Sequence, residues 1–279
     1  MELVGITAGQ VFKVSKDPTW PSIVLTTNME ATAAHTWKWE ILWKTFKKSG
    51  SVTTAGNSWD ATTTFQDLGG AITLKVSAGT AAKTFTLKIE GEQPVADDVK
   101  AYVLTKAGAG GFEKLIGHES KFKHFDSNGS PIKSFDNGYG MCQLTTPAPT
   151  FEEIWNWKKN VDGGVKLYLA KQSIARTYLS QAGRTFTDSQ LQHETVCRWN
   201  GGSYHVWDAK GLAWVRNANI LCDSLTGNIG WDITEEDNKG KTEAQLHKRD
   251  ARPKGGYDKR KAGDKWIYSG VCYADAILD

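Results

Sequence analysis

The spacing of apolar residues changes near Pro94, and this change constrains the fold more than any other feature of the sequence. Three segments before Pro94 alternate apolar with polar residues, as half-buried β-strands do: Thr36–Ile41, Ala71–Val76 and Thr84–Ile89. Beyond Asp97 the apolar residues recur at helical spacing. The sequence therefore predicts a chain with both α and β structure in two domains, a β-rich domain over residues 1–93 and a mainly α domain over residues 97–279.

The N-terminal domain has the pattern of an immunoglobulin-like β-sandwich. Ala71–Val76 and Thr84–Ile89, joined by Ser77–Thr80, are typical of its closing hairpin. Glu92–Pro94 is expected to be a linker. Because the domain contains no cluster of titratable residues, we expect it to target or dock the protein rather than to catalyse a reaction.

The second domain is predicted to contain at least three helices. Thr150 and Glu153 form a capping box that begins one helix, and Val165 to Leu179 form the apolar face of a longer one. Thr187 or Asp188 caps a third, which is expected to end at Gly201–Gly202. The remaining extension, about 203–279, is predicted to be irregular.

Glu119 occupies a position where the helical pattern calls for an apolar residue. It lies on the same predicted stripe as Phe112, Leu115, Ile116 and Phe122. Burial penalises the charged form of a carboxyl group and so favours a proton donor near neutral pH. The alternative is a solvent-facing Glu at a frayed helix end, paired with Lys121 or Lys123.

Four segments around and after Glu119 resemble the motifs of one enzyme family. They are G-H-E-S-K-F (Gly117–Phe122), G-Y-G-M-C-Q-L-T (Gly138–Thr145), N-V-D-G-G-V-K-L-Y-L (Asn160–Leu169) and R-W-N-G-G (Arg198–Gly202). Their order resembles that of the catalytic domain of soluble lytic transglycosylases, relatives of goose-type lysozyme. The resemblance covers about Ala107 to Gly202 and implies a lysozyme-like α domain that cleaves the MurNAc-GlcNAc bonds of peptidoglycan glycan strands.

The resemblance also implies roles for individual residues. Glu119 matches the single catalytic acid/base, and Asn200 matches an Asn that faces this carboxyl group. The expected substrate-binding residues are Ser120, Tyr139, Met141, Gln143, Trp199, Asn200 and Tyr204. The sequence departs from the family's pattern at two places in the site. Met141–Cys142 stands where the family has Leu-Met. Trp199 stands where the family has a Tyr, and Tyr139 or Tyr204 could supply the missing hydroxyl group.

The resemblance implies a lyase that leaves 1,6-anhydromuramyl ends, because Glu119 serves in turn as acid and base while substrate groups take the place of a second carboxylate. A lysozyme or chitinase-like hydrolase of the same fold is the alternative, with Asp126 or Asp136 activating water. Both aspartates also fit ordinary turns. A non-catalytic wall-binding or tail-structural protein is the third candidate.

Composition and spacing argue against other functions. The chain has 34 Lys and Arg against 31 Asp and Glu, so its charge does not favour nucleic acid. No segment has the length of a membrane span. No histidine follows His118 at metalloprotease spacing, and Lys106–Gly111 lacks the Lys-Ser/Thr of a phosphate loop. We expect neither a metal nor a cofactor.

The start of the sequence lacks the pattern of a signal peptide. We therefore expect delivery to the bacterial periplasm or cell wall by an injection system, such as type VI secretion, or by phage lysis machinery. An injected toxin would have a cognate inhibitor. The pairing of Cys142, Cys197, Cys222 and Cys272 stays open.

Two further features have alternative interpretations. Among the 12 tryptophans, Trp155, Trp157 and Trp199 are candidate sugar platforms, although aromatic residues also fill cores. The basic segment Lys248–Lys265 is either a strap for anionic wall polymer or a solvated loop.

Overall fold

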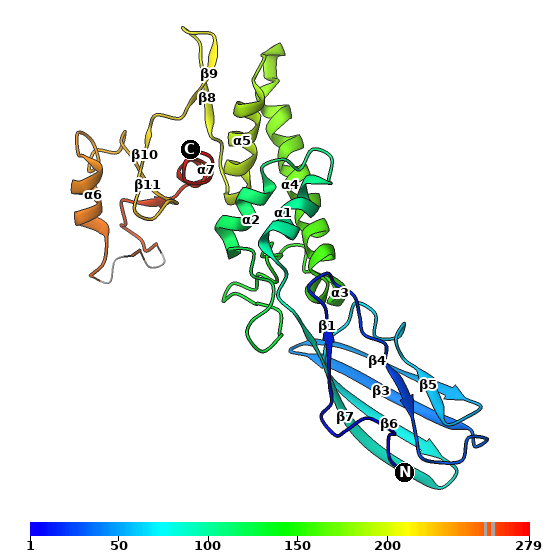
Figure 1. Ribbon diagram of the computed structural model, residues 1–279. Helices are drawn as coiled ribbons and strands as arrows, with labels where there is room; N and C mark the ends of the chain where they lie inside the picture. Colours follow the sequence, from blue (N-terminus) through cyan, green and yellow to red (C-terminus); the bar gives the residue numbers. More distant parts are fainter. Residues whose placement is uncertain (254–255, 258–259) are drawn as a thin grey trace. The chain divides into compact units, whose positions relative to one another are not determined.

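The computed structural model of the protein describes residues 1–253, 256–257 and 260–279 and contains both helices and β-sheets, as expected (Figure 1). The chain forms two compact units. The first comprises Met1–Lys106 and Glu119–Gly164, and the second comprises Ala107–His118 and Val165–Asp279. No helix in the part of the chain that the structure describes is both long and apolar enough to cross a membrane.

The first unit contains a five-stranded sheet in the order β1-β7-β6-β3-β4 and a two-stranded sheet of β2 and β5 (Figure 1). The strands are β1 (Val11–Val14), β2 (Val24–Thr26), β3 (His35–Trp43), β4 (Phe46–Thr54), β5 (Ser58–Asp60), β6 (Gly70–Ala78) and β7 (Ala81–Gly91). All pairs are antiparallel except β1 with β7. Strands β6 and β7 are paired along their length, from the pair of Gly70 with Ile89 to the pair of Ala78 with Ala81. This confirms the predicted hairpin.

The core of this unit combines one face of the large sheet with the segment that follows Glu119. Alternation along β3 buries Trp37, Ile41 and Trp43 on one face. The same apolar cluster includes Phe125, Tyr139, Phe151, Ile154 and Trp155. The sheet therefore supports the polypeptide on which most of the candidate site residues lie.

Two predictions for this unit are wrong. Trp155 and Trp157 are each only 1% exposed, so neither can offer a ring face to a sugar. Gln93 is not part of a loose linker, because its side-chain carbonyl accepts hydrogen bonds from the backbone N–H groups of His124 and Phe125. These bonds fasten the segment after Glu119 to the end of the sheet, and residues 93–97 lie inside the first unit.

Two helices, α3 (Phe151–Trp155) and α5 (Asp188–Asn200), begin where local capping chemistry predicts. The other helices between Pro94 and Gly201 are α1 (Ala96–Leu104), α2 (Phe112–Ser120) and α4 (Trp157–Leu179). A 3₁₀ turn at Gln181–Gly183 precedes α5. The predicted Thr150–Glu153 capping box begins α3, and Thr187 caps α5 together with Gln190. The boundary between the two units falls within α2 and within α4.

The segment after Gly202 is more regular than the sequence indicates. It contains β8 (His205–Asp208), β9 (Ala213–Arg216), β10 (Ile220–Cys222), β11 (Ile229–Asp232), α6 (Glu243–Asp250), β12 (Ile267–Tyr268) and α7 (Gly270–Leu278). The strands are short, and long-range contacts order them: Ile229, Trp231, Leu246 and Trp266 form a small core. Lys254, Gly255, Asp258 and Lys259 of the predicted basic strap lie outside the described residues.

The C-terminal helix α7 is fixed against α5 by a close backbone contact and to β10 by a disulfide. A Cβ atom on Gly270 would lie 2.0 Å from the carbonyl oxygen of Gly201 and 2.4 Å from that of Cys197. Cys222 and Cys272 form the disulfide across a sequence separation of 50, while Cys142 and Cys197 are free and buried.

Gly270→Ala should destabilise the second unit, because the new methyl group meets backbone atoms that cannot rotate away. We expect the free energy of unfolding, measured by denaturant titration, to fall by about 1–3 kcal/mol. Gly110→Ala is the matched control, since nothing lies within 4 Å of a Cβ atom there. Equal stability of the two variants would contradict the close packing of α7.

Removing the disulfide should also destabilise the protein. The double variant Cys222→Ser/Cys272→Ser is expected to lose about 2–4 kcal/mol of unfolding free energy, because the unfolded chain gains freedom that the closed loop denies it. A reducing agent should lower the stability of the wild type to the same extent and leave the double variant unchanged. A reductant effect of similar size on the double variant would contradict this assignment.

Candidate active site

Glu119 is the penultimate residue of α2 and is partly buried. Phe112, Leu115 and Ile116 are fully buried, which confirms three positions of the predicted stripe. Phe122 does not continue the stripe, because the helix ends at Ser120 and both Lys121 and Phe122 have positive φ angles, 54° and 60°. Such backbone conformations are costly for residues other than glycine, and they often occur at functional sites.

The loop Gly138–Leu144 forms a tight turn in the first unit. The backbones of Tyr139 and Leu144 exchange two hydrogen bonds of 3.1 Å. Gln143, at φ 50°, donates from Nε2 to the carbonyl oxygen of Gly140 at 2.7 Å. Gly140 has φ 67°, and a Cβ atom there would come within 2.7 Å of the side chains of Asn160 and His124. Only glycine fits at this point.

Two fully buried polar side chains hold this loop. Asn160 of α4 accepts the Cys142 N–H at Oδ1 (3.0 Å) and donates from Nδ2 to the Tyr139 carbonyl oxygen (3.1 Å). His124 accepts the Met141 N–H at Nδ1 (3.3 Å) and donates from Nε2 to the Ile154 carbonyl oxygen (2.9 Å). Both ring nitrogens of His124 are therefore used in the neutral form, and burial lowers its pKa to about 3.

Sequence reasoning assigned no role to either side chain. Asn160 begins the third of the four motifs, and this position was its only signal. His124 follows His118 by six positions, which is not the spacing of a metalloprotease motif, so the sequence gives it no role. A histidine whose two ring nitrogens both bond to backbone atoms gives no pattern that a sequence can reveal.

The charge of Glu119 acts on the middle of the loop. Burial raises the pKa of the Cys142 thiol, and the negative charges of Glu119 and Asp162 raise it further. The Glu119 carboxylate thus lies within electrostatic range of the buried thiol in the middle of the loop. Residues of three of the four motifs lie in the first unit: Glu119 is next to the last residue of α2, Cys142 occupies the loop, and Asn160 binds the loop from α4.

Asp126 and Asp136 both make the turn bonds that their sequence contexts predict. Oδ1 of Asp126 accepts hydrogen bonds from the N–H groups of Asn128 (2.8 Å) and Ser130 (3.0 Å). Asp136 accepts a hydrogen bond from the Ser134 hydroxyl, which itself accepts one from the Gly138 N–H. Both aspartates are exposed and hold the conformation of their own turns.

Three predicted substrate-binding residues lie in the second unit. Asn200 is the exposed last residue of α5, and Trp199 is partly buried with its ring centroid 5.6 Å from that of Phe112. Tyr204 is buried, and its hydroxyl donates to Oδ1 of Asp275 at 2.6 Å. Burial and the Asp275 charge raise the pKa of Tyr204. The donor of this hydroxyl is thus already engaged by Asp275.

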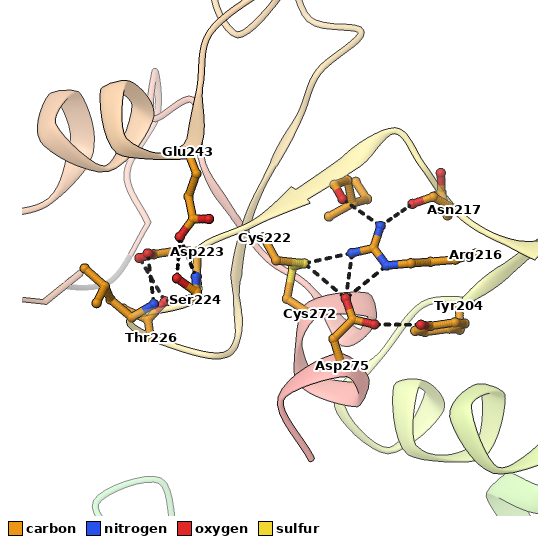
Figure 2. Close-up of a disulfide and its surroundings, with 12 residues drawn as sticks. Tyr204, Arg216, Asn217, Cys222, Asp223, Ser224, Thr226, Glu243, Cys272 and Asp275 are labelled. Atoms are coloured by element: carbon orange, nitrogen blue, oxygen red, sulfur yellow. Dashed lines mark hydrogen bonds and ion pairs between the residues drawn. A yellow bond between two sulfur atoms is a disulfide. The ribbon is translucent and has the colours of Figure 1, made fainter. Parts of the chain in front are cut away.

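Asp275 connects this region to the disulfide, as Figure 2 shows. Its Oδ2 accepts hydrogen bonds from Nη2 (2.6 Å) and Nε (3.0 Å) of Arg216, beside Cys222. Arg216 also donates from Nη1 to two backbone carbonyl oxygens. The aspartate therefore links the C-terminal helix to Tyr204 and to β9 within the second unit.

No protein-family model, no curated protein and no solved structure matches this chain. Within residues 1–253, 256–257 and 260–279, no group of three or more His, Cys, Asp or Glu side chains is arranged to hold a metal ion.

His124 should make stability depend on pH. Its folded pKa of about 3 lies below the ordinary value of 6.5, so the unfolded chain binds the proton more readily. The stability that neutral His124 contributes is complete above pH 6.5 and is lost progressively as the pH falls toward 3. At pH 5 the free energy of unfolding should be lower by about 2 kcal/mol than at neutral pH. Denaturant titrations at pH 7 and pH 5 should show this loss for the wild type and for the exposed-site control His118→Gln, but less of it for His124→Gln. An identical pH dependence of all three proteins would contradict the assignment.

Proposed function

We propose that this protein cleaves the glycan strands of peptidoglycan as a lytic transglycosylase, with Glu119 as its single general acid and base. The observation that carries the proposal is the association of Glu119 with the Gly138–Leu144 loop, which Asn160 fastens in turn. These residues come from three motifs that resemble those of the family, and they are separated by up to 41 positions in the sequence.

The chemistry follows from one carboxyl group used twice. Protonated Glu119 donates its proton to the glycosidic oxygen while the bond from that oxygen to C1 of the muramyl sugar breaks. The resulting carboxylate then accepts the proton of the 6-hydroxyl group as this oxygen bonds to C1. The product is a 1,6-anhydro ring, water is not consumed, and Glu119 returns to its protonated state.

The proposal includes a fold assignment for each part of the chain. The two sheets of the first unit and the β6–β7 hairpin support an immunoglobulin-like sandwich that docks or targets the enzyme. Helices α2, α4 and α5 carry residues of three of the four motifs, and the mainly helical character of this part of the chain supports a lysozyme-like domain. Ser120 and Gln143, which lie in the same unit as Glu119, would then shape the sugar-binding site.

The disulfide supports a site of action outside the reducing cytoplasm. Cys222 and Cys272 join the C-terminal helix to the preceding strands. Structural disulfides persist in compartments such as the bacterial periplasm. This is the compartment in which peptidoglycan would be the substrate.

A hydrolase of the same fold receives less support. Its water-activating carboxylate would be Asp126 or Asp136, and each of these accepts hydrogen bonds within its own turn. A purely wall-binding protein would use the same loop without chemistry at Glu119. Replacement of Glu119 distinguishes this last candidate from both enzymes.

Glu119→Gln should abolish cleavage, because an amide cannot donate the required proton. We expect solubilisation of purified peptidoglycan to fall by at least about 10²-fold, the range contributed by general acid catalysis. Glu113→Gln on the same helix is the control, since its amide oxygen can still accept the Gly111 N–H that Glu113 binds at 2.9 Å. Equal activity of Glu119→Gln and wild type would contradict the proposal, as would an inactive wild type.

A further inference from the structure

The outer face of the five-stranded sheet in the first unit carries an open polar hollow. The inner face of this sheet is buried in the core, so alternate residues of β3, β4 and β6 point outward. A hollow of about 500 Å³ lies over these three strands. Its lining includes six outward-facing side chains, those of Lys38, Glu40, Ser49, Ser51, Thr73 and Lys75, and we call it the Lys38–Lys75 hollow.

The pairing of the strands sets these side chains in two rows. Lys38 of β3 stands opposite Ser51 of β4 on one side and opposite Lys75 of β6 on the other. In the next row of the same face, Glu40 stands between a serine of β4 and a threonine of β6. The register therefore places two ammonium groups side by side, among three hydroxyl groups and one carboxylate.

No carboxylate of the described residues neutralises this pair of lysines. Lys38 and Lys75 are both exposed, and within the part of the chain that the structure describes neither forms an ion pair. The Glu40 carboxylate is engaged by Lys47, whose Nζ lies 2.5 Å from its Oε2. Like charges directly opposite each other on neighbouring strands destabilise a sheet. An anion bound over both ammonium groups removes this repulsion, so the hollow is complementary to negative charge.

The surroundings of the two lysines suit a charged group that projects from a polar polymer. The serine and threonine hydroxyls of the hollow can donate to an anion or bond to its neutral neighbours. Thr84 and Thr86 of β7, both exposed, stand opposite Lys75 and Thr73 and extend the two rows. The sheet face thus offers an extended polar surface with its positive charge at one place.

We propose that the Lys38–Lys75 hollow is a further binding site for peptidoglycan, in which the two ammonium groups hold a carboxylate of the peptide stems. This inference rests on the proposed function, which makes peptidoglycan the substrate. The sugars of the glycan strands carry little charge of their own, so the stem carboxylates are the groups that match the lysine pair. The hollow contains none of the residues assigned to the reaction, and it therefore holds the polymer without taking part in cleavage.

The test is sedimentation with purified peptidoglycan from which phosphate-bearing polymers have been removed. All proteins carry Glu119→Gln, so that the polymer stays intact during the measurement. Adding Lys38→Gln/Lys75→Gln should weaken binding at least about tenfold at low salt, because two charge-assisted contacts are lost. Added salt should weaken binding of the parent protein more than binding of this variant.

Two controls separate a specific site from general attraction between charges. Lys210→Gln/Lys239→Gln makes the same change of charge at exposed positions of the second unit, and this variant should bind like the parent. Peptidoglycan whose carboxyl groups have been converted to amides should bind the parent as weakly as native peptidoglycan binds Lys38→Gln/Lys75→Gln. The latter variant should fold with an unchanged or higher Tm, because it removes a repulsion on an exposed surface.

Three results would overturn the inference: equal binding of the parent and Lys38→Gln/Lys75→Gln, equal weakening by the control pair, or undiminished binding to the amidated polymer. Each of them leaves cleavage by Glu119 intact, because the wild type would still release fragments. A wild type that releases no fragments would instead contradict the proposed function. Specific loss of binding in Lys38→Gln/Lys75→Gln would in that case still support the hollow as a binding site.

Discussion

The candidate site depends on the hydrogen bonds that Asn160 and His124 make to the backbone of the Gly138–Leu144 loop. A tight loop in a protein interior exposes peptide groups that no helix or sheet can satisfy, and each unsatisfied group costs about 1–3 kcal/mol. Asn160 satisfies two of them, and His124 satisfies one while binding α3 through Ile154. The loop is therefore rigid, and the thiol of Cys142 stays buried near Glu119.

The second unit solves a similar problem with a charge. Glu194 bonds to the peptide groups of Tyr204 and His205, and Gly201 and Gly202 supply the positive φ angles that the turn after α5 requires. The C-terminal helix packs on the same turn through Gly270, and the disulfide keeps that helix in place. In both units a buried polar side chain on a helix fixes a glycine-containing loop.

Local chemistry made part of this structure predictable. The capping box at Thr150 and the hairpin after Ala71 depend on neighbouring residues, and the sequence predicts both correctly. Of the two caps considered for α5, Thr187 and Asp188, the structure has Thr187. Interactions between distant residues were not predictable. Gln93 was expected in a linker but binds the backbone of His124. The short strands after Gly202 require the disulfide and a small core. Trp155 and Trp157 are buried in the interior.

For the candidate site, the sequence supplies expectations that stay predictions. A carboxylate on an apolar stripe pointed to Glu119, and motif order pointed to Gln143 and Asn200. Glu194 shows the same pattern, because it follows Leu191 by three positions on α5 and both side chains are buried. Phe122 was misplaced because the end of α2 depends on the backbone angles of Lys121 and Phe122, and neither residue carries a glycine or proline signal.

The most direct test of the central claim, a single carboxyl group acting as acid and then as base, is the mass of the products. Purified peptidoglycan should be digested with the wild-type protein, and the soluble muropeptides should be measured by mass spectrometry. The account predicts products with 1,6-anhydromuramyl ends, lighter by one water molecule than hydrolysed fragments, and their absence after digestion with Glu119→Gln. Reducing ends that incorporate oxygen from labelled water would contradict it, because water would then have replaced the 6-hydroxyl group as the nucleophile.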